Sequence, residues 1–156
     1  MRKIALGIAA AAALASTPAL AGQATGTVQV SLNVSSSCSV STQPLDFGTT
    51  NSFAANNDAS TTATVKCTPL AQYEVLLDYG TNASGTQRRL KSAAGGFVTY
   101  ALFSDAARSI PWTPLAGVPG VGDGNEKALT IYGRVPSQSA VAAGDYKDTV
   151  TITVNY

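Results

Sequence analysis

Apolar and polar side chains alternate with a period of two near both ends of the chain. The alternating apolar positions are Val28, Val30, Leu32 and Val34 near the start, and Val150, Ile152, Val154 and Tyr156 at the end. The residues between them are Thr, Gln, Ser or Asn. Strict alternation is typical of an extended strand with one apolar and one polar face. The pattern therefore predicts a strand in each of these two segments.

Shorter segments with strand character lie between these two. They are predicted at residues 62–67, 73–78, 97–103 and 129–135, and the stretches that separate them are rich in Gly, Pro, Asn, Ser and Asp. Such spacers are typical of turns, and no stretch after residue 21 has sustained helical periodicity. Several short strands at close spacing predict an all-β fold, specifically an immunoglobulin-like β-sandwich.

The first 21 residues have the composition of a secretory signal peptide. Arg2 and Lys3 precede an apolar run over residues 4–15, and Ala19-Leu20-Ala21 is a small-x-small cleavage pattern. A membrane anchor is the alternative, but the apolar run before Pro18 is shorter than the roughly 20 residues that a spanning helix needs. We expect residues 1–21 to be removed on export.

Charge argues against a nucleic-acid partner. The full chain has 10 basic and 9 acidic side chains, so loss of Arg2 and Lys3 leaves eight basic against nine acidic residues. Proteins that bind DNA or RNA need clustered Lys and Arg to neutralise phosphates. The one local basic cluster, Arg88, Arg89 and Lys91, is expected to form a solvated loop.

Two cysteines, Cys38 and Cys67, are present and histidine is absent. In an exported chain an isolated cysteine pair is most simply a disulfide, because the compartment is oxidising. Closing a loop of this length stabilises a fold by about 3 to 4 kcal/mol in the loop-entropy model. A metal site would need further ligands, so we expect no metal and no cofactor.

An enzymatic function finds little support in the residues. Histidine, the usual general base near neutral pH, is missing, and no nucleophile-elbow, phosphate-loop or zinc motif occurs. Carboxylates could form a glycosidase pair, but turns and strand ends are where Asp commonly makes local hydrogen bonds. The residues expected in such positions are Asp46, Asp78, Asp105, Asp145 and Asp148.

The first predicted strand has two possible partners. It precedes Cys38 and is joined to it by the polar linker Ser35-Ser36-Ser37. It could pair within its own domain as the first strand, or it could complete the sheet of another copy by β-strand addition. The second alternative is a head-to-tail contact whose repetition builds a filament. The alternation by itself favours neither.

Three further segments are informative: the C-terminal stretch 144–156, beginning Gly144-Asp145-Tyr146, with 100–108 and 28–34 upstream. With these segments the chain resembles the spore coat protein U domain family, which includes major subunits of archaic chaperone-usher pili of the Csu type. The resemblance covers essentially the whole mature chain in order. It implies an incomplete immunoglobulin-like pilin that lacks its last strand. A periplasmic chaperone would lend a strand, which a neighbouring subunit's N-terminal extension replaces at the outer-membrane usher.

The resemblance also implies roles for residues of this chain. The donor side chains would be Val28, Val30, Leu32 and Val34, and Cys38 and Cys67 would link the first strand to the second. Val150, Ile152 and Val154 would line the acceptor groove, while the carboxylate of Tyr156 would dock on basic residues of the chaperone.

The sequence thus predicts a signal peptide (1–21), a donor-strand extension with its linker (22–37) and a pilin domain (38–156). The expected function is that of a structural subunit of a surface pilus, exported through the periplasm, that serves adhesion or biofilm formation. Its expected partners are the chaperone, the usher and neighbouring copies of itself. The alternatives are a secreted spore-coat-like structural protein and an adhesin module that binds carbohydrate or a surface.

Overall fold

Residues 22–156 are described in a computed structural model, and the predicted signal peptide lies outside them. The chain divides into two units, one ending at Asn33 and the other comprising Val34–Tyr156. The second unit is built of strands. These are β1 (Cys38–Thr42), β2 (Asn57–Cys67), β3 (Gln72–Leu77), β4 (Arg88–Ser92), β5 (Phe97–Phe103), β6 (Val118–Val121), β7 (Glu126–Val135), β8 (Tyr146–Lys147) and β9 (Ile152–Asn155).

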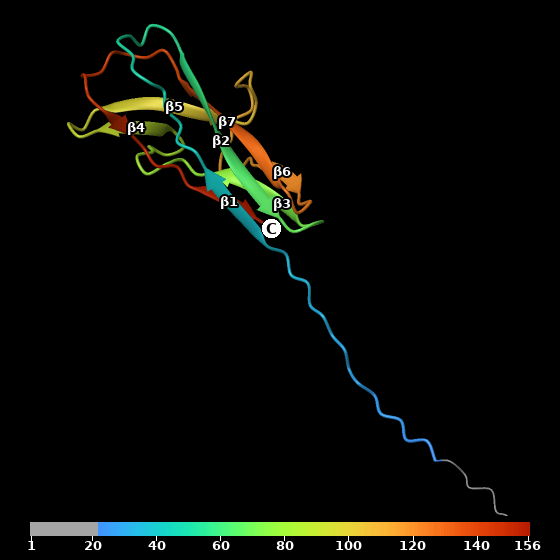
Figure 1. Cartoon of the computed structure of the whole chain (residues 1–156). Coiled ribbons are helices and arrows are strands. Elements are labelled where there is room, and N and C mark those ends of the chain that lie inside the picture. Colours follow the sequence, from blue (N-terminus) through green and yellow to red (C-terminus); the bar gives the residue numbers. More distant parts are fainter. Residues whose placement is uncertain (1–21) are drawn as a thin grey trace, which may run out of the picture. The chain divides into compact units, whose positions relative to one another are not determined.

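The strands of Val34–Tyr156 form two sheets (Figure 1). One sheet has six strands in the order β1-β2-β7-β5-β4-β8, and the other has three in the order β6-β3-β9. Every pairing between these strands is antiparallel. The described residues contain no helix that is long and apolar enough to cross a membrane. The all-β sandwich predicted from the sequence is confirmed.

The core lies between the sheets and follows the period of two. In β3 the buried residues are Tyr73, Val75 and Leu77, and β5 buries Val98, Tyr100 and Leu102 in the same manner. Trp112, from the connection between β5 and β6, is only 1% exposed, and its Nε1 donates a hydrogen bond of 2.7 Å to the carbonyl oxygen of Val75. Its indole therefore fills the core without leaving a polar group unpaired.

One disulfide joins the first two strands. Cys38 and Cys67 are directly opposite each other in the β1–β2 ladder and are bonded through their sulfur atoms. The bond closes a loop with a sequence separation of 29 residues. The disulfide expected from the sequence is therefore present, and it fixes the start of β1 to the end of β2.

The expectation that Arg88, Arg89 and Lys91 form a solvated loop is wrong, because these residues belong to β4. Arg88 is 4% exposed, and its guanidinium donates hydrogen bonds to the carbonyl oxygens of Leu77, Asp78 and Trp112. Burial lowers the pKa of Arg88, while the nearby Tyr100 and Asp78 act in the opposite direction. The buried cation is tolerated because carbonyl oxygens satisfy its donors.

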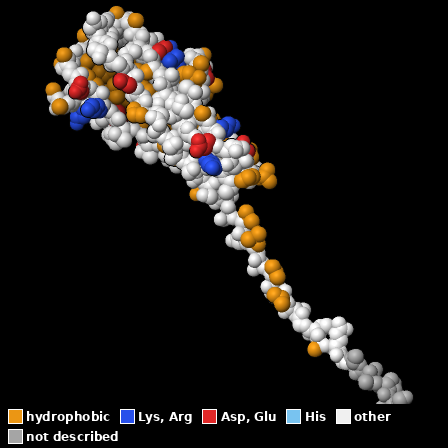
Figure 2. All heavy atoms as spheres, viewed as in Figure 1, with side chains coloured by type: hydrophobic (Ala, Val, Ile, Leu, Met, Phe, Trp, Pro, Cys, Tyr) orange, Lys and Arg blue, Asp and Glu red, His pale blue; other side chains and the backbone are white. Residues whose placement is uncertain are grey.

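The strand expected near the start of the chain is also absent from this structure. Residues 22–37 contain no strand, and the side chains of Val28, Val30, Leu32 and Val34 are 82 to 90% exposed. Apolar side chains follow one another along this extended segment in Figure 2. Alternation gives a segment the capacity to form a strand, but a strand requires a hydrogen-bonded neighbour.

Candidate assembly site at the open edge of β9

The candidate site is the free edge of the three-stranded sheet. β9 pairs with β3 on one side, with Val154 opposite Val75 and Ile152 opposite Leu77. Among residues 22–156 no strand pairs with the other side of β9. A complete immunoglobulin-like sandwich has a further strand in that position. The sandwich is therefore incomplete and lacks its last strand, as the family resemblance implied.

The hydrogen-bond pattern shows which backbone groups of β9 face the free edge. The N–H of Asp78 donates to the carbonyl oxygen of Thr151 at 3.0 Å, and the N–H of Thr151 donates to Oδ1 of Asp78, so these two residues occupy a hydrogen-bonded position of the ladder. Hydrogen-bonded and non-hydrogen-bonded pairs alternate along an antiparallel ladder. Thr153 and Asn155 therefore bond to β3, and the backbone N–H and C=O groups of Ile152 and Val154 point to the free edge.

The same two residues direct their side chains toward the core. Val150, Ile152 and Val154 are partly buried and pack against the hydrophobic core, whereas Thr151 and Thr153 are exposed. Ile152 and Val154 thus present a partly uncovered apolar surface together with unpaired backbone groups. An apolar strand edge of this kind is a template for pairing with another chain.

The opposite wall of the open side is formed by β1, which contacts β9 and lies beside the C-terminus in Figure 1. Among the described strands β1 pairs only with β2. The N–H of Thr68 donates a hydrogen bond of 2.9 Å to the carbonyl oxygen of Ser37, and this bond shows which residues of β1 are hydrogen-bonded to β2. The same alternation places the backbone groups of Val40 on the free edge. Val40 is 39% exposed. Two edge strands, one from each sheet, therefore border the opening.

The start of β9 is held in place by two carboxylates. Oδ1 of Asp78 accepts hydrogen bonds from the N–H groups of Thr151 and Gly80, each at 2.9 Å. Burial acts to raise the pKa of Asp78, but these bonds and the nearby Arg88 lower it below its usual value.

The second carboxylate is Asp148, whose Oδ1 accepts hydrogen bonds from Thr81 Oγ1 and from the N–H of Asn82. The local hydrogen bond expected of Asp78 is observed with Gly80, whereas Asp148 bonds to residues that are distant in the sequence.

The residues predicted for the acceptor groove lie at the open side, whereas the predicted donor residues belong to the N-terminal extension. β9 and the segment before it carry Val150, Ile152 and Val154, and the 61% exposed Tyr156 follows β9 directly. The importance of Val40 was missed, because an isolated valine among Ser and Thr gives no clear signal. Only the order of strands in the sheets identifies β1 as an edge.

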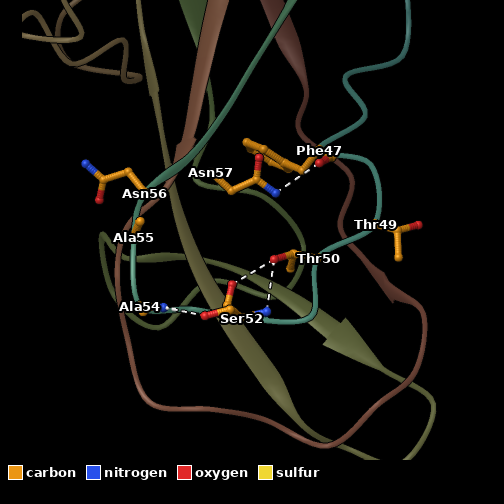
Figure 3. Close-up of a pocket in the computed structure, with 8 residues that line it drawn as sticks. All are labelled: Phe47, Thr49, Thr50, Ser52, Ala54, Ala55, Asn56 and Asn57. Atoms are coloured by element: carbon orange, nitrogen blue, oxygen red, sulfur yellow. Dashed lines mark hydrogen bonds between the residues drawn. The ribbon is translucent and has the colours of Figure 1, made fainter.

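A separate depression lies in the loop between β1 and β2 (Figure 3). It has a volume of about 310 Å³ and is lined by small and hydroxyl side chains together with Phe47 and two asparagines. The polar groups bond to one another: Asn57 Nδ2 donates to the Phe47 carbonyl oxygen at 3.0 Å, and Thr50 Oγ1 donates to that of Ser52 at 2.7 Å. Within residues 22–156 no three His, Cys, Asp or Glu side chains form a metal-binding group.

Two solved structures share this fold. A chain of the CsuC–CsuE chaperone–tip adhesion subunit pre-assembly complex, from archaic chaperone-usher Csu pili of Acinetobacter baumannii, has a TM-score of 0.60 and 23% identity. The match covers 79% of this chain and 40% of that one. The P pilus rod subunit PapA has a TM-score of 0.51 and 17% identity, over 76% of this chain and 98% of its own. At these identities the likeness shows the fold.

Sequence comparison establishes the family. Protein U of Myxococcus xanthus is 31% identical over an alignment of 167 residues, which covers 95% of this chain and 93% of that protein. The model of the Spore Coat Protein U domain matches residues 24–153. Both matches agree with the resemblance inferred from residues 28–34, 100–108 and 144–156. The chain belongs to the Spore Coat Protein U domain family.

Proposed function

We propose that this protein is the subunit of a surface pilus of the chaperone-usher type, in which residues 26–34 of one copy complete the sandwich of the next. The observation that carries the proposal is the open edge of β9, where Ile152 and Val154 combine partly uncovered side chains with unpaired backbone groups. The likeness to chains from two pilus systems supports it. The role is structural and uses no catalytic residue.

The exposed N-terminal segment has the properties of the missing strand. Nine residues from Gly26 to Val34 extend about 30 Å at the rise of a β-strand, which is long enough to lie along a small domain. Its four alternating apolar side chains are at least 82% exposed. Burying each stabilises the junction by about 1.5 to 3 kcal/mol, or roughly 6 to 12 kcal/mol for the four before the loss of entropy is included.

The proposal assigns partners to the open edge at each stage. In the periplasm a chaperone covers β9 with a strand of its own, and Tyr156 lies within its reach. At the outer membrane an usher exchanges that strand for residues 26–34 of an incoming copy. The fibre is then displayed at the cell surface, where it serves adhesion or biofilm formation.

Deletion of residues 22–34 tests the donor role, with the chaperone co-expressed in the periplasm. The shortened chain retains the open edge, so it should still be recovered in a chaperone complex. It should form no fibres visible by electron microscopy. Normal fibres from this variant, or a mature chain that is a stable monomer with residues 26–34 inserted in its own sandwich, would refute the proposal.

A second candidate is a secreted coat protein that assembles without an usher. It is favoured by the nearly full-length match to Protein U and by the name of the family. The two candidates differ in their genetic surroundings, since only the pilus requires genes for a chaperone and an outer-membrane usher nearby. Assembly of the purified mature chain without either factor would favour the coat protein.

A further inference from the structure

One end of the sandwich carries an exposed leucine in an unusual backbone conformation. Leu70, in the turn between β2 and β3, is 86% exposed and has a φ of 66°. This left-handed region is disfavoured for residues with a branched or bulky side chain and is typically occupied by Gly or Asn. A residue held there against its preference points to a functional constraint on the turn.

The turn is fixed by its neighbour, the connection between β6 and β7. The N–H of Leu70 donates to the carbonyl oxygen of Gly122 at 2.8 Å, and the N–H of Gly122 donates to that of Ala71 at 2.8 Å. A Cβ atom at position 122 would collide with the carbonyl oxygen of Thr68, so only glycine allows this approach. Leu70 is therefore presented on a rigid support.

Leu70 belongs to a small apolar patch, which we define as Pro69, Leu70 and Val121. Pro69 is exposed, Val121 is 56% exposed, and the pairing of Gln72 with Val121 places the two segments side by side. Apolar side chains protrude at this end of the domain in Figure 2. Clustered exposed apolar side chains are characteristic of interaction surfaces, in contrast to single scattered ones.

The patch is close to the point where the N-terminal extension joins the domain. Cys38 begins β1 and is bonded to Cys67, which precedes Leu70 by three residues. Three serines separate Val34 from Cys38, so those two Cα atoms are at most about 14 Å apart. When residues 26–34 fill a neighbour's groove, this end of the domain must therefore face that neighbour.

From this geometry we propose a second contact between copies: the patch of Pro69, Leu70 and Val121 packs on the opposite end of the next subunit and limits bending at the junction. A donor strand that runs antiparallel to β9 of the neighbouring copy continues the antiparallel sheet of that copy. It places Val34 of the donor near Val150 of the neighbour. The surface met by the patch is then formed by the β1–β2 and β3–β4 loops, residues 43–56 and 78–87. This inference rests on the proposed donor-strand assembly.

Substitution of Leu70 by asparagine tests the contact. Asparagine tolerates positive φ, so the turn should fold, and donor-strand junctions should persist as the same ladder of polymers in unheated gels. Fibres of the variant should bend more, with a persistence length in electron micrographs at least twofold shorter than that of the native protein. Ile110→Asn is the control, because Ile110 is 57% exposed but follows β5 near the middle of the sandwich.

A photo-crosslinking residue at position 70 gives a second readout. In polymers it should link to residues 43–56 or 78–87 of a neighbouring copy, and the same residue at position 110 should give no such product. A normal polymer ladder with unchanged bending and no crosslink from position 70 would overturn the second contact alone. Absence of the ladder from the native protein would instead overturn donor-strand assembly.

Discussion

The hydroxyl of Tyr100 donates a hydrogen bond of 2.7 Å to Oδ2 of Asp148. Tyr100 lies in β5 of the six-stranded sheet, and Asp148 lies in the segment between β8 and β9. Burial raises the pKa of Tyr100, and the bond to Asp148 raises it further, so the hydroxyl keeps its proton and remains a donor. The bond links one sheet to the segment that leads into the open edge of the other.

Replacing Tyr100 with phenylalanine removes this bond and should lower the free energy of unfolding by about 1.5 to 3 kcal/mol, the range for a hydrogen bond to a charged group. Urea unfolding of the mature chain measures the change. Tyr132→Phe, at a half-buried position of β7, is the control and should change stability by less than about 0.5 kcal/mol. An equal loss of unfolding free energy in the two variants would show that the hydrogen bond between Tyr100 and Asp148 does not stabilise the fold.

Leu32→Asp should abolish polymer formation. The substitution places a carboxylate on the apolar face of the donor segment, and a buried charge without a partner is strongly unfavourable. Ser31→Asp adds the same charge on the polar face and should leave polymers intact. Gel electrophoresis of unheated samples separates the outcomes, and polymers of Leu32→Asp at the native level would contradict the donor role.

Val154→Asp should greatly reduce recovery of the chain with its chaperone. Val154 packs against the core at the open edge, whereas the adjacent Thr153 is exposed. Thr153→Asp is therefore the matched control and should be recovered at close to the native level. Co-purification from the periplasm provides the measurement, and similar recovery of the two variants would argue against β9 as the acceptor strand.

Asp78 should make the start of β9 sensitive to acid. Its pKa in the folded chain lies below the value of about 3.9 expected in the unfolded chain, so its ionised form stabilises the fold. That contribution is complete above about pH 4 and is lost as the pH falls through the folded pKa. Asp78→Asn should therefore lower the Tm at pH 7, and its difference from the native protein should shrink below pH 4. Melting curves between pH 2.5 and 7 test this, and a difference that is constant with pH would contradict it.

Replacing both Cys38 and Cys67 with serine should lower the free energy of unfolding by about 3 to 4 kcal/mol, because the disulfide closes a loop of 29 residues. Chemical unfolding with and without a reducing agent measures the effect. The native protein should lose the same stability on reduction, and the double variant should not respond. A stable native protein under full reduction would show that strand pairing alone holds β1.

The period of two in the sequence predicts β2, β3, β5, β7 and β9, but it gives no prediction of β1, β4, β6 and β8. β5 spans the same residues as predicted, and β3 differs by one position at each end. β2 begins five residues earlier than expected, because its polar first half pairs with β7 and buries little apolar surface. The pattern of hydrophobic residues does not predict which polar residues form hydrogen bonds to a partner strand.

Other features depend on tertiary contacts that the sequence does not encode locally. Arg88 occurs in a run of basic residues, and only the three carbonyl oxygens around its guanidinium explain its burial. The pattern of residues 150–156 predicts an apolar face, and the family resemblance implies an open last strand, but only the order of the strands shows which side of β9 is open. The segment 28–34 has strand periodicity, and the partner that would make it a strand is absent from its own chain's sheets.

At Ile152 and Val154 the side chains face the core and the backbone N–H and C=O groups face the free edge. This arrangement restricts the register in which a donor strand can pair with β9. A donor strand that is shifted by one residue would turn its apolar side chains toward water. Its backbone N–H groups would also be out of register with the carbonyl groups of β9. Sliding can therefore occur only in increments of two residues, and each increment leaves one apolar side chain without its site. In the proposed fibre the loss of that contact favours one register over all others, so every link between copies has the same length.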